Sequence, residues 1–538
     1  MSGSKPGVAA DTILPHAEPR GIAWRLFLTC WLVYLLFVNP AGNVMSNTIL
    51  GATVSLAEGQ SFDVNLRFPQ EAPDLSFVVY RTGVGPPLVR HLSGLPPGAS
   101  LAAVPCYTPA WWLKQLLPQH LAHRSLFGID EDVMRGAGFQ VPPGFALLIP
   151  PLIYWLQLVA AASLSTTAAA GTVVLCYLVL RHLRFPLWER LTASFALAFG
   201  TSLFPHAITY GTEALGTFLS FAAFAVICLS PPDPRVQRRW LTRAGCLAGA
   251  ATAVDYWAGV ISLLLVFYSF RKAAWSGVRA LLLGMATPIV LLGFYHQLFF
   301  GAPWKTAYSF RALALVTKHQ TGLAGLTGLN PLALWGLSFS PFQGLFVYQA
   351  FLLAAVLGVL VRWRLAVSSE LILSLVILVG LFLFSASSQY LLTWNGALIG
   401  RGPSRMILAM PFITVLLASG LDAVRSIFWR GLMLGLVGVS VAIQCLGAAW
   451  GGAAFPDAHA ATLVLIGNVQ ALQVRPIALM AQAVLQRGFS APLFRVYSDS
   501  DAAAMLWTIL SLLLIAWSCL WIWSPLLAGR EHSTGRPT

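Results

Sequence analysis

Long apolar runs, separated by short polar connections, make up most of the chain. Many of these runs approach the ~20 residues that a helix needs to cross a bilayer, so the pattern predicts transmembrane helices. Basic clusters stand between the runs, and the usual excess of Lys and Arg in cytoplasmic loops assigns them to the cytoplasmic face. These clusters are Arg181/Arg184/Arg190, Arg235/Arg238/Arg239/Arg243, Arg271/Lys272/Arg279, Arg362/Arg364 and Arg425/Arg430.

Threading the chain between these clusters predicts an all-α polytopic membrane protein with about 12 to 14 transmembrane helices. Two further apolar segments, 101–117 and 145–162, are either additional spans or helices lying at the membrane interface. The other predicted spans are 22–40, 164–183, 188–204, 206–229, 244–254, 256–270, 280–300, 345–362, 368–387, 406–424, 431–450 and 506–527.

The predicted topology also divides the chain into regions. Long connections fall on the outer face, and loops held by a rigid scaffold are where binding groups usually lie, so we expect function there. The regions are a cytoplasmic tail (1–21), a transmembrane core (22–450) with a long extracytoplasmic loop (39–163), an extracytoplasmic segment (451–504), a last transmembrane helix (505–527) and a cytoplasmic tail (528–538).

Composition agrees with this pattern and excludes other classes. Of the 538 residues, 57% are hydrophobic and 10% are charged, whereas soluble proteins carry about 25% charged residues. The net charge of +14 lies in short connections, without a Lys/Arg run or aromatic–basic interleaving, so nucleic acid is not a predicted partner. The seven cysteines show no CxxC or zinc spacing and are predicted to be small core residues.

Acidic residues are scarce, with 19 in the whole chain, so those in or beside the membrane are informative. Glu213 and Asp255 lie near the predicted outer face. A carboxylate at the bilayer centre costs about 2.5 to 3.5 kcal/mol, so such groups normally face a cavity. Glu58, in the first outer loop, is a third candidate. The alternative is that Glu213 and Asp255 are helix caps or structural partners of a nearby Arg or Tyr.

Several cations lie on the predicted outer side, against the usual bias. Lys305, Arg401 and Arg405 therefore indicate a compensating anion, and snorkelling to lipid headgroups is the alternative interpretation. Arg90 and His91 precede a predicted helix start, where cations beside free backbone N–H groups would favour an anion.

Other kinds of site have weaker support. Trp394 and Tyr308 fit either an interfacial aromatic belt or a platform on which a sugar stacks. The chain has no Gly-rich phosphate loop after a strand, no nucleophile elbow and no HExxH or other metal-ligand spacing. No cofactor is predicted, and dependence on a divalent metal stays open.

A few carboxylates and several cations at an outer membrane face suit sugar transfer from a lipid phosphate. The phosphate is already a good leaving group, and Arg or Lys side chains stabilise its charge as the bond breaks. One carboxylate takes the proton from the acceptor hydroxyl while its oxygen attacks the anomeric carbon. Such a direct displacement inverts the sugar configuration.

Six sequence elements follow one another in a recognisable order. They are Arg90-His91-Leu92-Ser93-Gly94-Leu95-Pro96-Pro97-Gly98, the turn with Gly200, Thr201 and Pro205, the pair Asp255-Tyr256, the stretch Tyr295 to Pro303, the stretch Ser340 to Tyr348, and Trp394 with Gly396, Gly402 and Pro403. Over residues 22–450 this order resembles bacterial membrane proteins of the GT-C glycosyltransferase superfamily, in the broad branch with protein O-mannosyltransferases and the lipid A aminoarabinose transferase.

The resemblance implies a GT-C-like helical bundle in the bacterial inner membrane, with a polyprenyl-phosphate donor and an active site facing the periplasm or exterior. It also places Tyr256 in the substrate cavity. This chain departs from the family pattern at Leu95, where relatives have Lys, and at Ser404, where they have Arg, although Arg401 and Arg405 are close by. No acidic residue follows the first span directly, so Asp255 and Glu58 stay alternative choices for the base.

The leading hypothesis is an integral membrane glycosyltransferase that moves a sugar from a polyprenyl-phosphate donor to a glycan, lipid or protein acceptor. The expected site comprises Asp255 or Glu58 as base, Arg90, His91, Lys305, Arg401 and Arg405 at the donor phosphate, and Glu213, Tyr256, Trp394 and Tyr308 around the substrate cavity. One alternative is a non-catalytic polytopic protein or a transporter of lipid-linked glycans. Another is an enzyme resembling O-antigen polymerases or ligases, whose polymerase form would give a ladder of products.

Overall fold

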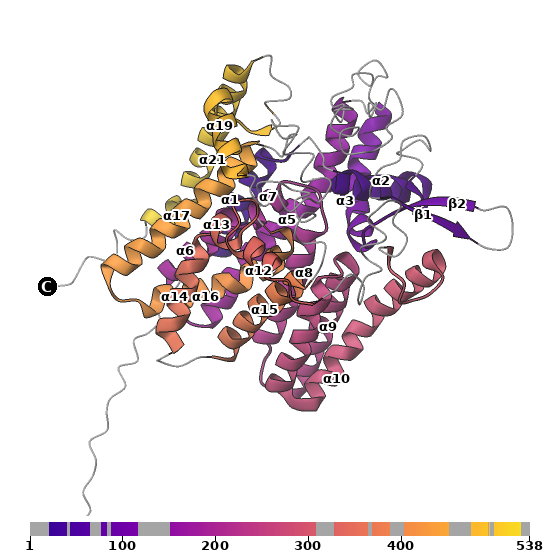
Figure 1. The fold of residues 1–538 in the computed structure, drawn as a ribbon, viewed down its shortest axis with the longest axis horizontal. Coiled ribbons are helices and arrows are strands. Elements are labelled where there is room, and N and C mark those ends of the chain that lie inside the picture. The colour runs from indigo at the N-terminus through magenta and orange to yellow at the C-terminus, as the bar shows by residue number, and fades with distance from the viewer. Residues whose placement is uncertain are drawn as a thin grey trace, which may run out of the picture.

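In the residues that it describes, the computed structural model is mostly helical (Figure 1). Six helical segments in the described part of the chain are long and apolar enough to cross a membrane, as expected for a multi-pass protein, and the total number of spans stays a prediction. These segments are Leu156–His182, Ala258–Phe300, Ser369–Ala386, Ser404–Ala423, Ile427–Ala449 and Asp501–Leu520. The structure describes residues 21–39, 44–64, 77–82, 88–116, 151–307, 328–363, 368–387, 403–450, 475–492, 494 and 500–528.

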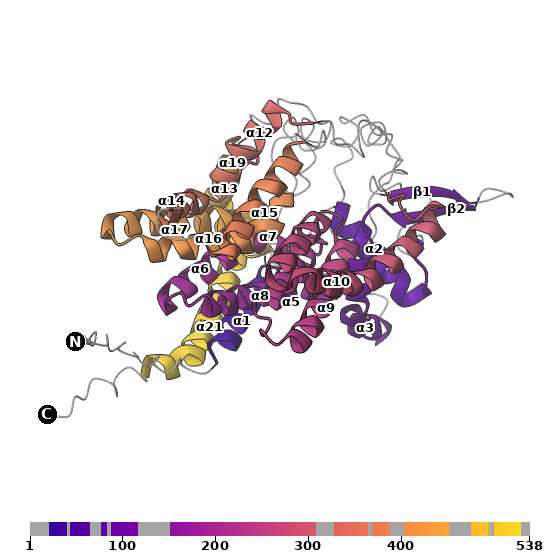
Figure 2. The same ribbon diagram turned by 90° about the horizontal axis from the view of Figure 1, so that it is seen from below.

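The core is a bundle in which helices from distant parts of the sequence pack together. Nearly every residue of α16 (Met410–Ala423) is buried, and this helix packs against α6 (Leu187–Phe199), α14 (Phe351–Trp363) and α15 (Ser369–Ala386). Two other helices, α1 (Ile22–Leu36) and α21 (Asp501–Ala528), lie side by side in both ribbon views (Figures 1 and 2).

The remaining elements complete the bundle and its connections. They are α2 (Val44–Gly59), β1 (Phe77–Thr82), β2 (Leu88–Ser93), α3 (Gly98–Leu116), α5 (Pro151–His182), α7 (Leu203–Ala207), α8 (Glu213–Cys228), α9 (Pro234–Val254), α10 (Ala258–Phe300), α12 (Pro331–Ser338), α13 (Leu345–Tyr348), the 3-10 helix η6 (Ser404–Ala409), α17 (Ile427–Trp450) and α19 (Pro476–Arg487).

The first predicted outer loop contains one helix that the sequence predicted, α3, and two elements that it did not, helix α2 and the hairpin of β1 and β2. Helices α2 and α3 pack against each other, and β1 pairs with β2 in an antiparallel hairpin that projects from the helical body (Figure 2). The apolar segment 101–117 corresponds to α3. The segment 145–162, as far as it is described, continues without a break into the predicted span 164–183, because both belong to α5.

Tyr210 fastens this outer region to the bundle. The Tyr210 hydroxyl lies 2.7 Å from the Thr53 hydroxyl of α2 and donates a hydrogen bond to the carbonyl of Ala99 in α3, at 3.3 Å. The Tyr210 carbonyl accepts a hydrogen bond of 2.6 Å from Ser46. The start of α3 also lies against the end of α9, since a Cβ at Gly98 would be 2.6 Å from the Ala253 carbonyl oxygen. Elements of the first outer loop therefore reach the end of α9.

Among the described helices, α9 and α10 form the most extensive contact, and small residues make it close. The helical geometry of α10 is interrupted at Ala273 and Ala274, where Ala274 has φ +50°, so two helical segments meet there. This break falls between the predicted spans 256–270 and 280–300. The first segment packs on α9 through Ser262, whose hydroxyl donates to the Ala248 carbonyl at 2.9 Å.

The second segment of α10 lies backbone to backbone against α9. A Cβ at Gly245 would overlap the carbonyl oxygen of Leu281, and one at Gly284 would overlap that of Thr242. Small residues permit such close helix packing in membranes.

We predict that Gly245→Ala destabilises the protein by about 1 to 3 kcal/mol through overpacking, measured as thermal unfolding in detergent. Gly435→Ala on α17, where nothing lies within 4 Å, is the control and should not destabilise it.

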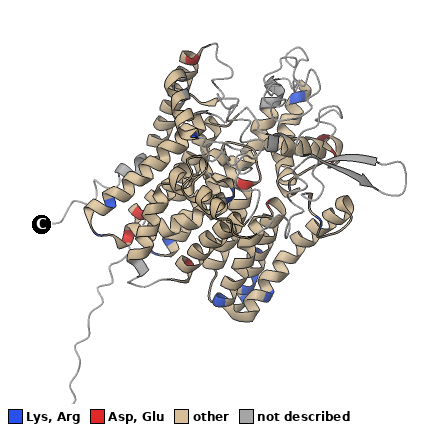
Figure 3. Cartoon of the chain, in the orientation of Figure 1, with Lys and Arg blue, Asp and Glu red and all other residues tan. Residues whose placement is uncertain are grey.

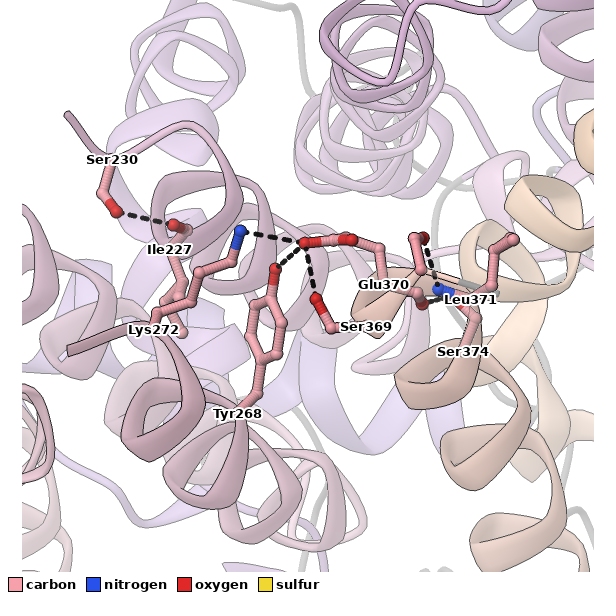
Figure 4. A network of polar contacts seen from close by, with 9 residues as sticks. Ile227, Ser230, Tyr268, Lys272, Ser369, Glu370, Leu371 and Ser374 are labelled. Carbon is pink, nitrogen blue, oxygen red and sulfur yellow. Dashed lines mark hydrogen bonds and ion pairs between the residues drawn. The ribbon is translucent and has the colours of Figure 1, made fainter. Parts of the chain in front are cut away.

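A buried polar network holds the break in α10 against α15 (Figure 4). The Glu370 carboxylate oxygen Oε1 accepts hydrogen bonds from the Tyr268 hydroxyl at 2.7 Å and the Ser369 hydroxyl at 3.1 Å, and Lys272 Nζ lies 2.9 Å from it. The Lys272 ammonium group also lies over the Tyr268 ring, 5.6 Å from its centroid. Because this carboxylate has a cation and two donors of its own, the network is a structural anchor.

The basic residues of α9 and α10 gather at one end of this helix pair (Figure 3). They include Arg235, Arg238, Arg239 and Arg243 near the start of α9, and Arg271, Lys272 and Arg279 around the break in α10. Asp255 follows the last residue of α9, at the other end of that helix. The helix pair therefore separates a basic end from an end that carries a buried acid.

Candidate functional site

Asp255 occupies the turn between α9 and α10. One carboxylate oxygen, Oδ1, accepts a hydrogen bond of 3.0 Å from the backbone N–H of Trp257, and the Asp255 carbonyl accepts one of 2.9 Å from Ala258. An Asp side chain that bonds the N–H two residues later stabilises this kind of tight turn. The sequence therefore fixes the carboxylate locally, and Asp255 is 2% exposed.

Arg405 brings a cation to this carboxylate from a distant part of the chain. One terminal nitrogen of its guanidinium group lies 3.6 Å from Asp255 Oδ1, and both side chains are largely buried. Arg405 belongs to η6, which leads into the buried helix α16. The structure thus brings together one of the two predicted base candidates and one of the predicted phosphate-binding residues.

Trp257 supports the Arg405 side chain from one face. The Arg405 guanidinium carbon lies 5.0 Å from the centroid of the Trp257 ring, within the range of a cation–π interaction. The same ring meets Phe384 of α15 edge to face, at a centroid distance of 4.9 Å. Trp257 was not a predicted site residue. An Asp in a turn often accepts a hydrogen bond from the backbone N–H two residues later, so Asp255 could have indicated the Trp257 N–H as its partner.

The second carboxylate oxygen of Asp255 has a different environment. Within the described part of the chain, Oδ2 is buried and makes no hydrogen bond. It faces Gly216 of α8, where a Cβ would lie 4.0 Å from Oδ2 and 3.2 Å from the Asp255 Cβ. A carboxylate with one oxygen held and the other without a donor is suited to accept a proton.

Burial raises the pKa of the Asp255 carboxyl above its ordinary value. The positive charge of Arg405 and the Trp257 N–H lower it and oppose this effect, whereas the negative charge of Glu213 raises it further. Glu213 is the first residue of α8, where a carboxylate interacts favourably with the helix dipole. The buried cluster therefore combines Asp255 and Arg405 with the nearby negative charge of Glu213.

Tyr256 and Lys305 belong to a neighbouring group of contacts. The Tyr256 hydroxyl lies 2.8 Å from His296 Nε2, and His296 Nδ1 lies 3.1 Å from the Pro303 carbonyl oxygen. Lys305 follows two residues later and is exposed, and its backbone N–H donates to the Ala302 carbonyl at 3.1 Å. The turn after α9 and the turn after α10 are therefore joined through one histidine.

Glu58, the other predicted base candidate, has its own partners. Its carboxylate accepts a short hydrogen bond from the Tyr107 hydroxyl and lies 3.0 and 3.1 Å from Lys114 Nζ. Gln157 of α5 donates to the Tyr107 hydroxyl at 2.9 Å. These contacts connect α2, α3 and α5, so a structural role accounts for this carboxylate.

The prediction that Arg90 and His91 directly precede a helix is wrong. Both residues lie in strand β2, where Arg90 pairs with Tyr80 and His91 with Val79, and α3 begins later, at Gly98. This segment pairs with β1 as an antiparallel strand, so its backbone is extended and not close to a helix start. Three further predicted site residues, Arg401, Trp394 and Tyr308, lie outside the described residues.

Among the described residues, no group of three or more His, Cys, Asp or Glu side chains is placed to hold a metal ion.

No family model matches the sequence, and no curated protein matches it.

The chain is similar in structure to ArnT from Cupriavidus metallidurans. The crystal structure bound to undecaprenyl phosphate has a TM-score of 0.47 and 13% identity, covering 86% of this chain and 77% of that chain. For the apo crystal structure the TM-score is 0.42 and the identity 13%, covering 90% of this chain and 74% of that chain.

Proposed function

We propose that the protein is a membrane glycosyltransferase that transfers a sugar from a polyprenyl-phosphate donor to a glycan, lipid or protein acceptor. The observation that carries the proposal is the buried pair of Asp255 and Arg405, with Asp255 Oδ2 lacking a hydrogen bond within the described residues. The pair lies at the end of α9 opposite its basic cluster, which supports a site facing the periplasm or exterior.

In this proposal Asp255 acts as the general base. Its carboxylate takes the proton of the acceptor hydroxyl while that oxygen attacks the anomeric carbon of the donor sugar. The bond between the sugar and the phosphate breaks at the same time, so the product has the inverted configuration. The raised pKa of Asp255 suits this role, because a carboxylate of higher pKa is a stronger base.

Arg405 has the second role, at the donor phosphate. A guanidinium group has five N–H donors and binds phosphate through paired hydrogen bonds, which suits it to hold the charge of the leaving group. Lys305 adds a second cation, and Arg90, His91 and Arg401 are further candidates for phosphate contacts. Glu213, Tyr256, Tyr308 and Trp394 are candidates for the lining of the substrate cavity.

The test is a transfer assay with the full-length protein reconstituted in vesicles that contain a polyprenyl phosphate carrying a labelled sugar. A membrane extract supplies acceptors, and the label is followed into lipid, glycan and protein fractions. We expect the labelled sugar to leave the donor and appear on one acceptor class, or to be released slowly by hydrolysis. In both cases the anomeric carbon of the sugar should have the inverted configuration. A folded protein that binds the donor and neither transfers nor hydrolyses it would contradict the proposal. A ladder of products of increasing length would favour a polymerase instead.

Glu213 provides a prediction about pH. Because its negative charge raises the pKa of Asp255, Glu213→Gln is expected to lower that pKa. The base then stays ionised to lower pH, so the acidic limb of the kcat/KM profile should move to lower pH. The control is Asp501→Asn, which removes an acidic residue from the first turn of α21 and should leave the profile unchanged. An acidic limb that stays in place or moves to higher pH in Glu213→Gln would contradict the prediction.

A further inference from the structure

His296 lies between two turns that carry proposed site residues. Its side chain projects from the last turns of α10, and the residue is 4% exposed. Aromatic rings surround it, with the ring centroids of Tyr295 and Phe300 each at 5.9 Å. Tyr295 in turn packs against Phe62, which follows α2, at 5.0 Å. The imidazole is therefore held in place by packing as well as by its hydrogen bonds.

The two ring nitrogens have complementary partners. The Pro303 carbonyl oxygen only accepts hydrogen bonds, so the contact of 3.1 Å requires the proton to be on Nδ1. In the neutral ring Nε2 then accepts, and the Tyr256 hydroxyl donates to it at 2.8 Å. One histidine thus accepts from the turn after α9 and donates to the turn after α10.

These two turns carry residues with proposed roles. Tyr256 directly follows Asp255 and precedes Trp257, which contacts Arg405. Pro303 lies two residues before Lys305, in a turn that begins at Gly301 with φ +79°. Without the His296 contacts, the exposed Lys305 turn would lose the hydrogen bond that links it to the Asp255 turn.

We propose that His296 is a positioning residue, which holds the Lys305 turn against the Asp255 turn so that Lys305 and Arg405 bind the same donor phosphate. This inference rests on the proposed function and extends it to a residue without direct contact to the substrate. It predicts an effect on donor binding more than on the chemical step, because the base and Arg405 keep their own contacts.

The test measures binding of polyprenyl phosphate to the full-length protein in nanodiscs, together with transfer kinetics. His296→Leu, which removes both hydrogen bonds, should weaken binding about tenfold, with a smaller change in kcat at saturating donor. His296→Gln, whose amide offers N–H donors for the Pro303 carbonyl and an oxygen that accepts from Tyr256, should restore most of the affinity. Tyr256→Phe should show part of the loss, and Tyr295→Phe, which removes a neighbouring hydroxyl outside these contacts, should show none.

A double-mutant cycle with Lys305→Met decides whether His296 acts through Lys305. If it does, His296→Leu has no further effect on binding in the Lys305→Met protein. Additive losses, or equal losses in His296→Leu and His296→Gln at equal thermal stability, would overturn the inference. A wild-type protein that binds the lipid phosphate without transferring sugar overturns only the proposed enzymatic activity. One that binds no lipid phosphate overturns both.

Discussion

Asp255→Asn is expected to lower kcat for sugar transfer by about 10²- to 10⁴-fold, the usual contribution of a general base. The asparagine side chain has the same shape and keeps an oxygen for the Trp257 N–H, so the turn should be preserved. Affinity for polyprenyl phosphate should be retained or increased, because Arg405 no longer faces a competing negative charge. The measurement is the transfer assay at saturating donor, with binding measured separately.

The matched control is Asp233→Asn at the other end of the same helix. Asp233 caps α9 by accepting hydrogen bonds from the N–H groups of Arg235 and Val236, at 2.8 and 3.2 Å, and Asn is an equally good N-cap. This variant should transfer sugar at the wild-type rate. Full activity of a folded Asp255→Asn protein would exclude Asp255 as the base and leave Glu58 as the candidate to test by Glu58→Gln.

Arg405→Gln is expected to have two large effects. It leaves the Asp255 carboxylate buried without its cation, and breaking a buried ion pair in this way costs about 3 to 5 kcal/mol of stability. It also removes a charged contact to the donor phosphate, which should weaken binding of polyprenyl phosphate about 10- to 100-fold. Thermal unfolding in detergent and lipid binding in nanodiscs measure the two effects.

The double variant Asp255→Asn/Arg405→Gln separates these effects. Removing both charges should recover much of the lost stability, because no uncompensated charge stays buried, but it should not recover lipid binding. Arg425→Gln, an exposed position just after α16, is the control for loss of a cation and should leave both quantities unchanged. If Arg405→Gln were as stable as wild type and bound the lipid equally well, the ion pair would have neither role.

Much of the helical framework is predictable from the sequence, because bilayer-length apolar runs and basic clusters are local signals. The break in α10 at Ala273 and Ala274 falls inside the basic connection 271–279 that separates two predicted spans. The hairpin β1–β2 and helix α2 were not predicted, since elements shorter than a membrane span lack such a signal. Helix α5 continues through the predicted boundary near residue 163, because small and polar residues there interrupt the apolar run without ending the helix.

The candidate site is predictable in part. Carboxylates are scarce in the sequence, which made Asp255 a candidate, and Arg405 is a cation on the predicted outer side. The pairing of these two residues depends on helix packing, which the sequence pattern does not predict. Trp257 and His296 act through contacts with residues far away in sequence, which no local pattern records. The same holds for Glu58, whose partner Lys114 lies 56 residues later and gives this acid a structural explanation.

The pairing of Asp255 with Arg405 has a consequence for biosynthesis. Arg405 is translated 150 residues after Asp255, which at ribosomal rates of about 5 to 20 residues per second is a delay of about 8 to 30 s. During that interval the newly made α9–α10 hairpin carries an acid without its cation, so the carboxyl must stay protonated or remain at the hydrated surface of the bilayer. The nascent chain therefore completes this part of the bundle only when η6 and α16 leave the ribosome.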